Sequence, residues 1–469
     1  MAHDQTKPDV FRDRIATADE SGKRIWLYVK KPSGRFHRAR VLVAVFLLGF
    51  LFSAPFVHIG GNPLMRFDVI HREFFIFGIA FWPQDFHLIV IGILILLVFI
   101  VLFTLAFGRL FCGWICPQTV FLEMVFRKIE YLIEGDANAQ RRLDNRPADA
   151  DKILRKGLKH VIYLAISFLI GNTFLAYIIG SDALYAIITD PPTEHLTGLG
   201  FMLLFTFLFY GVFSRFREQA CVLVCPYGRL QSVLLDRDSV VVAYDYKRGE
   251  PRGDKKHSGA GSGHGDCIDC FACVNVCPTG IDIRNGTQLE CVNCTACIDA
   301  CDEIMESMNR PRGLVRYASE NNISQGVKFH VTPKMIFYSA ALVLLLGLMA
   351  TLVIFRTEVE ATVLRASGET YEEVGEDLIR NIYTVKVINK TGVDKPVTLK
   401  LKYPPGGTLR LVGPALDAAP HGLAQSVFVV ELSRFQIFAK STQVIVDVYS
   451  GDRKLETIHT NFFGPEPKR

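Results

Sequence analysis

Five long apolar runs limit what this chain can fold into more than any other feature of its sequence. The runs at 87–107 and 335–355 contain no Asp, Glu, Lys or Arg and match the roughly 20 residues that a helix needs to cross a bilayer. The shorter runs contain Gly and polar residues and could instead be buried core helices. Half of all residues are hydrophobic and 35 are Phe, which is too apolar for a typical soluble enzyme. We therefore predict a multi-pass membrane protein with five spans, at 41–57, 87–107, 161–179, 197–214 and 335–355.

Basic residues gather on alternate sides of these runs and predict how the chain is oriented. Cytoplasmic loops carry an excess of Lys and Arg. The stretch before the first run, the second loop and the stretch after the fourth run are basic, whereas the loop 180–196 has no Lys or Arg. We expect a cytoplasmic N-terminus, a first run retained as an anchor and not cleaved as a signal peptide, and a periplasmic segment 356–469. The net charge of +5 follows mostly from this asymmetry and does not indicate a nucleic-acid partner.

All 12 cysteines lie between positions 112 and 301, in segments that this orientation places in the cytoplasm. Thiols stay reduced there, so paired cysteines indicate metal or redox sites and not disulfides. The segment 247–266 is rich in Gly and charge, and we expect a flexible linker that leads into the densest group of cysteines. Beyond the last run, alternating β-branched segments predict a C-terminal all-β sandwich of the immunoglobulin type.

The spacing Cys-x2-Cys-x2-Cys-x3-Cys occurs twice and indicates an α+β ferredoxin domain of the bacterial type with two [4Fe-4S] clusters. In such domains the fourth cysteine of each motif binds the other cluster. Zinc is the alternative. A zinc site needs only four thiolates, however, and does not require two motifs that each have three closely spaced cysteines and a fourth one. One departure is that Asp302, and not Pro, follows the second motif. We expect one cluster on Cys267, Cys270, Cys273 and Cys301, and the other on Cys291, Cys294, Cys297 and Cys277.

Two further cysteine pairs share the pattern Cys-x3-Cys-Pro, and each follows an apolar run. The pairs are Cys112 with Cys116, and Cys221 with Cys225. Pro117 and Pro226 suit the first turn of a helix, because a Pro there lacks only an N–H that has no partner. Paired thiolates favour Cu(I) or can cycle through a disulfide, whereas buried cysteines can also serve only as small apolar residues. Because the pattern recurs, we prefer a functional role.

Several other side chains could bind a metal or pack beside a cluster. His87 and His160 lie near spans, and single histidines at such positions are more often structural. Met305 and Met308 have helical spacing and are expected to pack over a cluster. A loose group in the loop 58–86 could hold copper and consists of His58, Met65 and His71.

The chain resembles the CcoG or FixG family, the membrane-bound, polyferredoxin-like accessory proteins of cbb3-type cytochrome c oxidase. The tandem cluster motif is widespread, but "FWPQDF" and "RGEPRG", within "FFIFGIAFWPQDF" and "YDYKRGEPRG", are more specific to this family. Other segments that carry the resemblance are "GKRIWLYVKKPSGRFHRAR", "GRLFCGWICPQTVFLEMVFRKIEYLIEGD", "VCPYGRLQSV", "GDCIDCFACVNVCPTGIDIRNG" and "ECVNCTACIDACDEIM". The resemblance implies an inner-membrane electron-transfer protein that reduces Cu(II) to Cu(I) for the oxidase. Its partners would be oxidase subunits or copper-delivery proteins, an unknown electron donor and membrane lipid.

Two other functions stay open at this point. The same clusters could exchange electrons with a quinol at the membrane face, or they could be structural parts of an assembly scaffold. For the organisation of the chain we expect a cytoplasmic arm, four spans, a cytoplasmic region, a fifth span and a sandwich. Their predicted ranges are 1–40, 41–215 with a cytoplasmic loop at 108–158, 216–333 with the ferredoxin domain at 257–310, 335–355 and 356–469.

Overall fold

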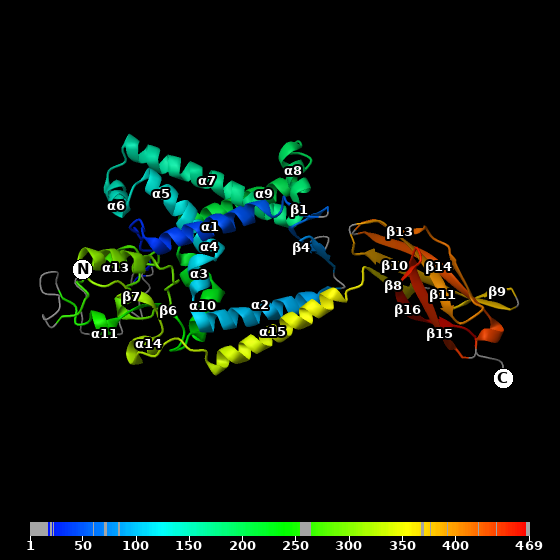
Figure 1. Cartoon of the computed structure of the whole chain (residues 1–469). Coiled ribbons are helices and arrows are strands. Elements are labelled where there is room, and N and C mark those ends of the chain that lie inside the picture. Colours follow the sequence, from blue (N-terminus) through cyan, green and yellow to red (C-terminus); the bar gives the residue numbers. More distant parts are fainter. Residues whose placement is uncertain are drawn as a thin grey trace. The chain divides into compact units, whose positions relative to one another are not determined.

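The computed structural model describes most of the chain in two compact units. The first unit consists of Met1–Pro55 and Ile89–Leu348, and the second of Phe56–Leu88 and Met349–Arg469. Figure 1 shows both units coloured along the sequence. The described residues are 17–18, 21, 23–59, 61–69, 73–82, 85–253, 264–366, 370–375, 377–391, 393–420, 422–437 and 439–465.

Among the described residues, five helices are long and apolar enough to cross a membrane, and each overlaps one predicted run. Two of them, at Arg35–Ser53 and Ala150–Ile179, begin more than five residues before their apolar runs, because charged residues form their first turns. The third begins at Ala150 and not at 161, since the Asp149 side chain caps it by accepting from the Lys152 amide. The five are α1 (Arg35–Ser53), α2 (Phe86–Phe107), α7 (Ala150–Ile179), α9 (Leu196–Gly211, continued by the π-helix η3, Val212–Phe216) and α15 (Pro333–Ile354).

Short helices follow two of the spans and carry the paired cysteines. As predicted, Pro117 and Pro226 begin helices, with Cys116 and Cys225 at their N-caps. The π-helical turns beside them were not predictable from the apolar spacing, and such turns often occur at functional sites. The elements are α3 (Leu110–Trp114), α4 (Pro117–Val120), η2 (Phe121–Phe126), α5 (Arg127–Ile133), α6 (Ala137–Asn145), α8 (Ser181–Thr189), η4 (Ala220–Val224) and α10 (Pro226–Leu234).

Aromatic packing and buried ion pairs hold these short helices to the spans. The rings of Phe126 and Phe213 stack with centroids 4.6 Å apart, and Tyr163 donates to the Phe126 carbonyl at 3.0 Å. Arg127 is 2% exposed and donates to Glu123 at 2.6 Å and to Glu218 at 3.3 Å. Because its third acceptor is the Pro278 carbonyl at 3.2 Å, Arg127 also ties α5 to the cysteine-rich region.

The cysteine-rich region combines short helices with a two-stranded antiparallel sheet. Its sheet pairs β6 (Val241–Tyr244) with β7 (Val315–Ala318), which both lie outside the predicted range 257–310. The prediction of a flexible linker at 247–266 was wrong for its beginning, because Arg248 forms an ion pair with Asp266 at 2.5 Å and donates to the Arg312 carbonyl at 3.0 Å. Residues 254–263 lie outside the described residues. The helices are α11 (Tyr246–Gly249), α12 (Ala272–Asn275), the 3-10 turn η5 (Ile283–Asn285), α13 (Ala296–Ser307) and α14 (Glu320–Gln325).

The second unit contains the predicted sandwich of two antiparallel sheets. Their strand orders are β12-β14-β10-β8, with β9 beside β10, and β13-β11-β15-β16. Alternate side chains of both sheets form one apolar core, in which the Tyr383 and Phe428 rings stack at 5.2 Å. The strands are β8 (Val359–Arg365), β9 (Glu372–Val374), β10 (Leu378–Asn389), β11 (Lys395–Tyr403), β12 (Thr408–Leu411), β13 (Leu416–Ala418), β14 (Leu423–Ser433), β15 (Ser441–Ser450) and β16 (Arg453–Phe463), with the 3-10 turn η6 at Arg434–Gln436.

The aromatic loop before the second span also belongs to the second unit. It forms a three-stranded sheet, and Asp85 at its end forms buried ion pairs with Arg356 at 2.5 Å and with Lys390 at 2.8 Å. These ion pairs hold the loop to the residue Arg356 before β8, the first strand of the sandwich, and to Lys390 at the end of β10. The strands are β1 (His58–Ile59), β2 (Asn62–Pro63), β3 (Met65–Asp68), β4 (Glu73–Ile76) and β5 (Ile79–Phe81).

Candidate functional site

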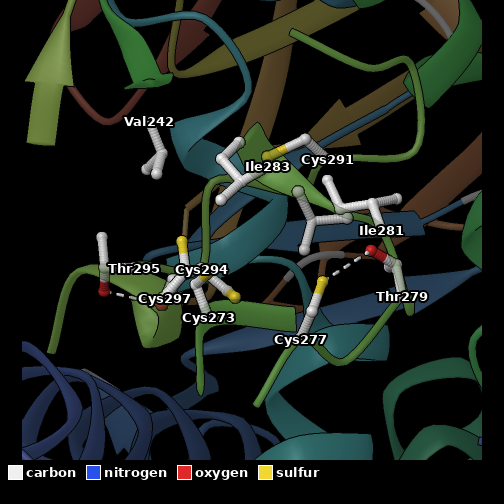
Figure 2. A pocket seen from close by; sticks show the side chains of 11 residues that line it. Val242, Cys273, Cys277, Thr279, Ile281, Ile283, Cys291, Cys294, Thr295 and Cys297 are labelled. Carbon is white, nitrogen blue, oxygen red and sulfur yellow. Dashed lines mark hydrogen bonds between the residues drawn. The ribbon is translucent and has the colours of Figure 1, made fainter. Parts of the chain in front are cut away.

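One cavity in the cysteine-rich region is surrounded by the second predicted set of four thiols. Figure 2 shows these side chains with apolar residues from β6 and from the segment around η5. Cys297 is the second residue of α13, and the Cys277 sulfur lies 3.4 Å from the Thr279 hydroxyl. The cysteines that line this cavity are Cys273, Cys277, Cys291, Cys294 and Cys297. Four of these five are the set expected for one cluster.

A second cavity is lined by the other predicted set. Its cysteines are Cys267, Cys270, Cys273 and Cys301. Met305 also lines it, as predicted, whereas Met308 ends helix α13 and is not among the lining residues. Because Cys273 lines both cavities, the two sites are separated by little more than one side chain.

The backbone of the two cysteine loops has the same unusual conformation. In each loop, the residue before the second cysteine and the residue after it have positive φ. These are Asp269 (54°) and Phe271 (56°) in the first loop, and Asn293 (54°) and Thr295 (63°) in the second. A left-handed conformation is strained for non-Gly residues, above all for bulky or β-branched ones, and such strain is typical of ligand sites. Here it turns three successive thiols of each loop toward one cavity.

The described thiols of these sets are spread more widely than a single zinc ion would hold them. A zinc ion with Zn–S bonds of about 2.3 Å would hold its sulfurs about 3.8 Å apart. Among the residues that the structure describes, no three cysteine sulfurs lie within 4.8 Å of one another. Burial raises the pKa of Cys291 and of Cys301 to about 12, so these thiols keep their protons at neutral pH until a metal displaces them.

Arg284 is a buried cation at the second cavity that the sequence analysis missed. It lines the cavity, forms ion pairs with Asp269 and, at 2.6 Å, with Asp282, and lies 4.2 Å from the centre of the Phe271 ring. It therefore braces both left-handed residues of the first loop. A basic residue shortly after a Cys-Pro motif is too common a pattern to indicate this role.

The four thiols of the Cys-x3-Cys-Pro pairs lie just beyond the ends of α2 and η3, near enough for each pair to act on the pKa of the other. Burial, with a smaller contribution from neighbouring thiols of the group, raises the pKa of Cys112 to about 11 against the opposing charge of Arg109, and that of Cys221 to about 12. Burial also raises the pKa of Cys116, and Cys225 acts in the same direction. All four are free thiols, and in the described part of the chain no three of them lie within 4.8 Å.

The first of these pairs packs directly against one cluster loop. Cys112 belongs to the same buried group as Val276, Val292 and Cys294, with Cys297 at its edge. A Cβ on Gly113 would lie 2.5 Å from the Val292 carbonyl oxygen, so the backbones of α3 and the loop are in close contact. This contact places a paired thiol beside two of the four cysteines expected to hold one cluster.

Two polar side chains that the sequence analysis missed support this arrangement. Gln231 of α10 is fully buried and accepts from the Cys112 thiol at 3.0 Å, while its amide donates to Tyr227 at 2.9 Å and to Thr104 at 3.2 Å. Arg109, which precedes α3, is buried and donates to the Leu289 carbonyl. Gln231 follows Cys225 at helical spacing, but only the fold shows that it reaches the other cysteine pair.

The remaining candidates do not join these sites in the described residues. His160 Nδ1 lies 3.0 Å from the Tyr210 hydroxyl, which fits a structural role, and His87 is exposed in the first turn of α2. His58 Nδ1 contacts the Phe56 carbonyl at 3.2 Å, and His71 lies outside the described residues. A partly exposed group that was not predicted has its ligand atoms within 4.8 Å of one another, and it consists of Asp190, Glu194 and His195.

Comparison with known proteins identifies the family. The chain is 34% identical over 440 residues to "Nitrogen fixation protein FixG" of Rhizobium meliloti (strain 1021), covering 84% of this chain and 82% of that protein. The chain belongs to the FixG family. It is 35% identical to "Protein RdxA" of Cereibacter sphaeroides over 79% of this chain and 80% of that protein, and 35% identical to "Protein RdxB" of the same organism over 82% and 83%.

Family descriptions match three parts of this FixG-family chain. A "4Fe-4S dicluster domain" matches 216–320, a "4Fe-4S binding domain" matches 89–134, and an "IG-like fold at C-terminal of FixG" matches 349–465. A crystal structure of a FixG-related protein from Vibrio parahaemolyticus matches 23% of this chain and 97% of its own, with 18% identity and a TM-score of 0.20. The chain is therefore a multi-pass iron-sulfur electron-transfer protein of the FixG family, and the match at 89–134 contains Cys112 and Cys116.

Proposed function

We propose that this chain reduces Cu(II) to Cu(I) for the assembly of a cbb3-type cytochrome c oxidase. The observation that carries the proposal is the shared buried group of Cys112, Cys294 and Cys297. A soft metal-binding thiol that touches the ligand loop of a one-electron cofactor is suited to pass single electrons to a bound metal ion.

The residues for the resident cofactors are the two predicted sets of four thiols. Cys267, Cys270, Cys273 and Cys301 would hold one [4Fe-4S] cluster, and Cys277, Cys291, Cys294 and Cys297 the other. Such clusters, when bound, supply single electrons at potentials that the protein tunes. Apolar residues line both cavities, and the left-handed residues fix the direction in which the thiols point.

The four paired thiols would bind the copper substrate. Cu(I) prefers soft thiolate ligands and accepts few of them, so Cys112 with Cys116 and Cys221 with Cys225 are each sufficient for a site. Reduction of Cu(II) to Cu(I) consumes one electron and no proton, while each thiol that binds copper releases its proton to solvent. By the distribution of basic residues, the reaction takes place on the cytoplasmic side, with the sandwich in the periplasm.

Anaerobic titration tests this function on the full chain with its clusters reduced. Added Cu(II) should oxidise the clusters, which is measured by their absorbance, while a Cu(I)-specific chelator detects the product in equal amount. The double variant Cys112→Ser/Cys116→Ser should keep its iron and lose most of the copper-dependent oxidation. Oxidation by a quinone but not by Cu(II) would favour a quinol dehydrogenase, and no electron exchange with either would favour a scaffold.

The family match at 89–134 favours a second role for the paired thiols. Because that family is described as a 4Fe-4S binding domain, the four thiols could hold a third cluster in place of copper. Iron analysis separates the two roles, since two clusters give about eight irons per chain and three give about twelve. Replacing either pair by Ser would lower the iron content in the second case only.

A further inference from the structure

A cavity of about 460 Å³ lies beside the first span, and the sites described above do not use it. Its walls come from the segment before α1, from the first turns of α1, and from η2 and α5. These walls come from two stretches of the sequence, 31–40 and 123–132, and both belong to segments that carry the family resemblance. The proposed redox function assigns no role to the cavity between them. The residues considered below are Lys31, His37, Arg40, Glu123, Lys128 and Leu132.

The cavity lining has an excess of positive charge. Lys31, Arg40 and Lys128 are basic, and Glu123 is the carboxylate that faces them. Glu123 already pairs with Arg127 at 2.6 Å and so compensates little of this charge. Burial and the nearby Lys31 ammonium both lower the pKa of Lys128, which reflects how close the cations lie to one another. An anion in the cavity would relieve this repulsion.

An unused hydrogen-bonding atom points to the same conclusion. His37 Nδ1 is buried and has no hydrogen-bond partner in the part of the chain that the structure describes. Its backbone amide, in contrast, donates to Asp299 at 2.8 Å. Buried polar atoms are nearly always satisfied, and this unpaired one belongs to a residue that lines the cavity.

The position of the cavity narrows the class of ligand. His37 and Arg40 lie in the first two turns of α1, a helix long enough to span a bilayer, and a span that begins there would place the cavity at the level of lipid headgroups. Leu132 at its rim is 86% exposed, which suits contact with apolar chains. Lys and Arg bind phosphate through charge-assisted hydrogen bonds, and basic pockets at the ends of spans bind anionic headgroups. We propose that this cavity binds a phosphate group, supplied either by an anionic phospholipid or by a soluble phosphate compound.

Binding measurements on the full chain, with its clusters in place, test the proposal in two arms. Native mass spectrometry in a neutral detergent measures binding of phosphatidylglycerol against phosphatidylcholine, and calorimetry measures binding of inorganic pyrophosphate. The test variant is Lys31→Ala/Lys128→Ala, which removes two exposed lysines from the cavity. The matched control is Lys30→Ala/Lys328→Ala, which removes two exposed lysines elsewhere and gives the same net charge.

We expect the test variant to bind about tenfold more weakly in at least one arm, with the control unchanged. A loss for phosphatidylglycerol assigns the site to a lipid headgroup, and a loss for pyrophosphate alone assigns it to a soluble compound. Equal affinities of the two double variants in both arms would overturn the proposal. If the test variant lost iron or thermal stability, two milder variants would replace it. Lys128→Gln should lose part of the binding affinity, whereas Lys31→Arg/Lys128→Arg, which preserves the charge, should bind as tightly as the unchanged chain.

Discussion

The two groups of thiols in the first unit are built in different ways. The eight cysteines of the cluster loops follow one another closely, and strained left-handed residues between them aim their sulfurs at two cavities. The two Cys-x3-Cys-Pro pairs lie far apart in the sequence and come near each other only through contacts between distant segments, such as the hydrogen bond from Cys112 to Gln231. In the first group the local backbone makes the site, whereas in the second group tertiary packing makes it. The geometry of the first group should therefore depend on its bound metal, and the geometry of the second group on the side chains that pack around it.

The largest expected effect is the loss of a cluster ligand. Cys291→Ser leaves three thiols of the predicted set Cys277, Cys291, Cys294 and Cys297 at the first cavity, and we expect iron to fall from about eight to about four per chain or lower. The strained loop would then lose the ligand that offsets its backbone strain, so the variant should also be less stable. Iron and sulfide analysis of anaerobically purified protein measures this. Cys112→Ser/Cys116→Ser is the matched variant for the second group, and it should keep its iron. If its iron content were as low as that of Cys291→Ser, the proposed difference between the two groups of thiols would be wrong.

This contrast also explains what the sequence could reveal. Spacing alone predicted the two sets of four cysteines, because three of each set follow one another closely and the doubled motif assigns the fourth to the other loop. It could not predict the left-handed Phe271 and Thr295, since residues of these types avoid that conformation unless the surrounding fold imposes it. The five spans and the sandwich strands were predictable from apolar runs and alternation.

The meeting of the paired thiols was only a hypothesis from sequence, because it depends on contacts between distant segments. Gln231 is 119 residues from its hydrogen-bond partner Cys112, and no local pattern links them. The same holds for Arg127 and the Pro278 carbonyl, which are 151 residues apart. Sequence reasoning thus grouped the thiols that line each cavity and missed the residues that hold the two groups together.

Removing the buried Arg127 should have the next largest effect. Arg127→Met would leave Glu123 and Glu218 without this partner and would break the contact with Pro278, next to a cluster cysteine. Breaking a buried ion pair costs about 3–5 kcal/mol, so we expect a clear fall of the apparent Tm in detergent. Arg155→Met is the control, because Arg155 is exposed and its pairing with Asp151 should contribute little. An unchanged Tm for Arg127→Met would show that the buried ion pairs do not stabilise this region.

A smaller change can separate the two groups of thiols without altering any ligand. In Gly113→Ala, the new Cβ would lie 2.5 Å from the Val292 carbonyl oxygen and would push α3 away from the cluster loop. Such overpacking costs about 1–3 kcal/mol. We expect the iron content to stay constant and copper-dependent cluster oxidation to slow. Gly157→Ala in α7 is the control, because no atom lies within 4 Å of its new Cβ. Equal oxidation rates for both variants would mean that this contact is not the route of the electron.

The smallest expected effect comes from Gln231, which tests how the second group depends on its neighbours. Gln231→Leu preserves the approximate volume but removes the acceptor of the Cys112 thiol and the donors to Tyr227 and Thr104. Each lost hydrogen bond contributes about 0.5–1.5 kcal/mol, so we expect copper binding to weaken several-fold. Iron content should not change, since Gln231 does not line either cluster cavity.

A matched control for this variant is Gln118→Leu. Gln118 follows the first Cys-x3-Cys-Pro pair, whereas Gln231 follows the second. The substitution removes the hydrogen bond from the Gln118 side chain to the Arg217 carbonyl at 3.2 Å and leaves the acceptor of the Cys112 thiol in place. If both Gln variants weaken copper binding equally, the effect arises from general loosening of the short helices. If only Gln231→Leu does so, the orientation of the Cys112 thiol determines the affinity, because the two variants differ in whether that thiol keeps its acceptor.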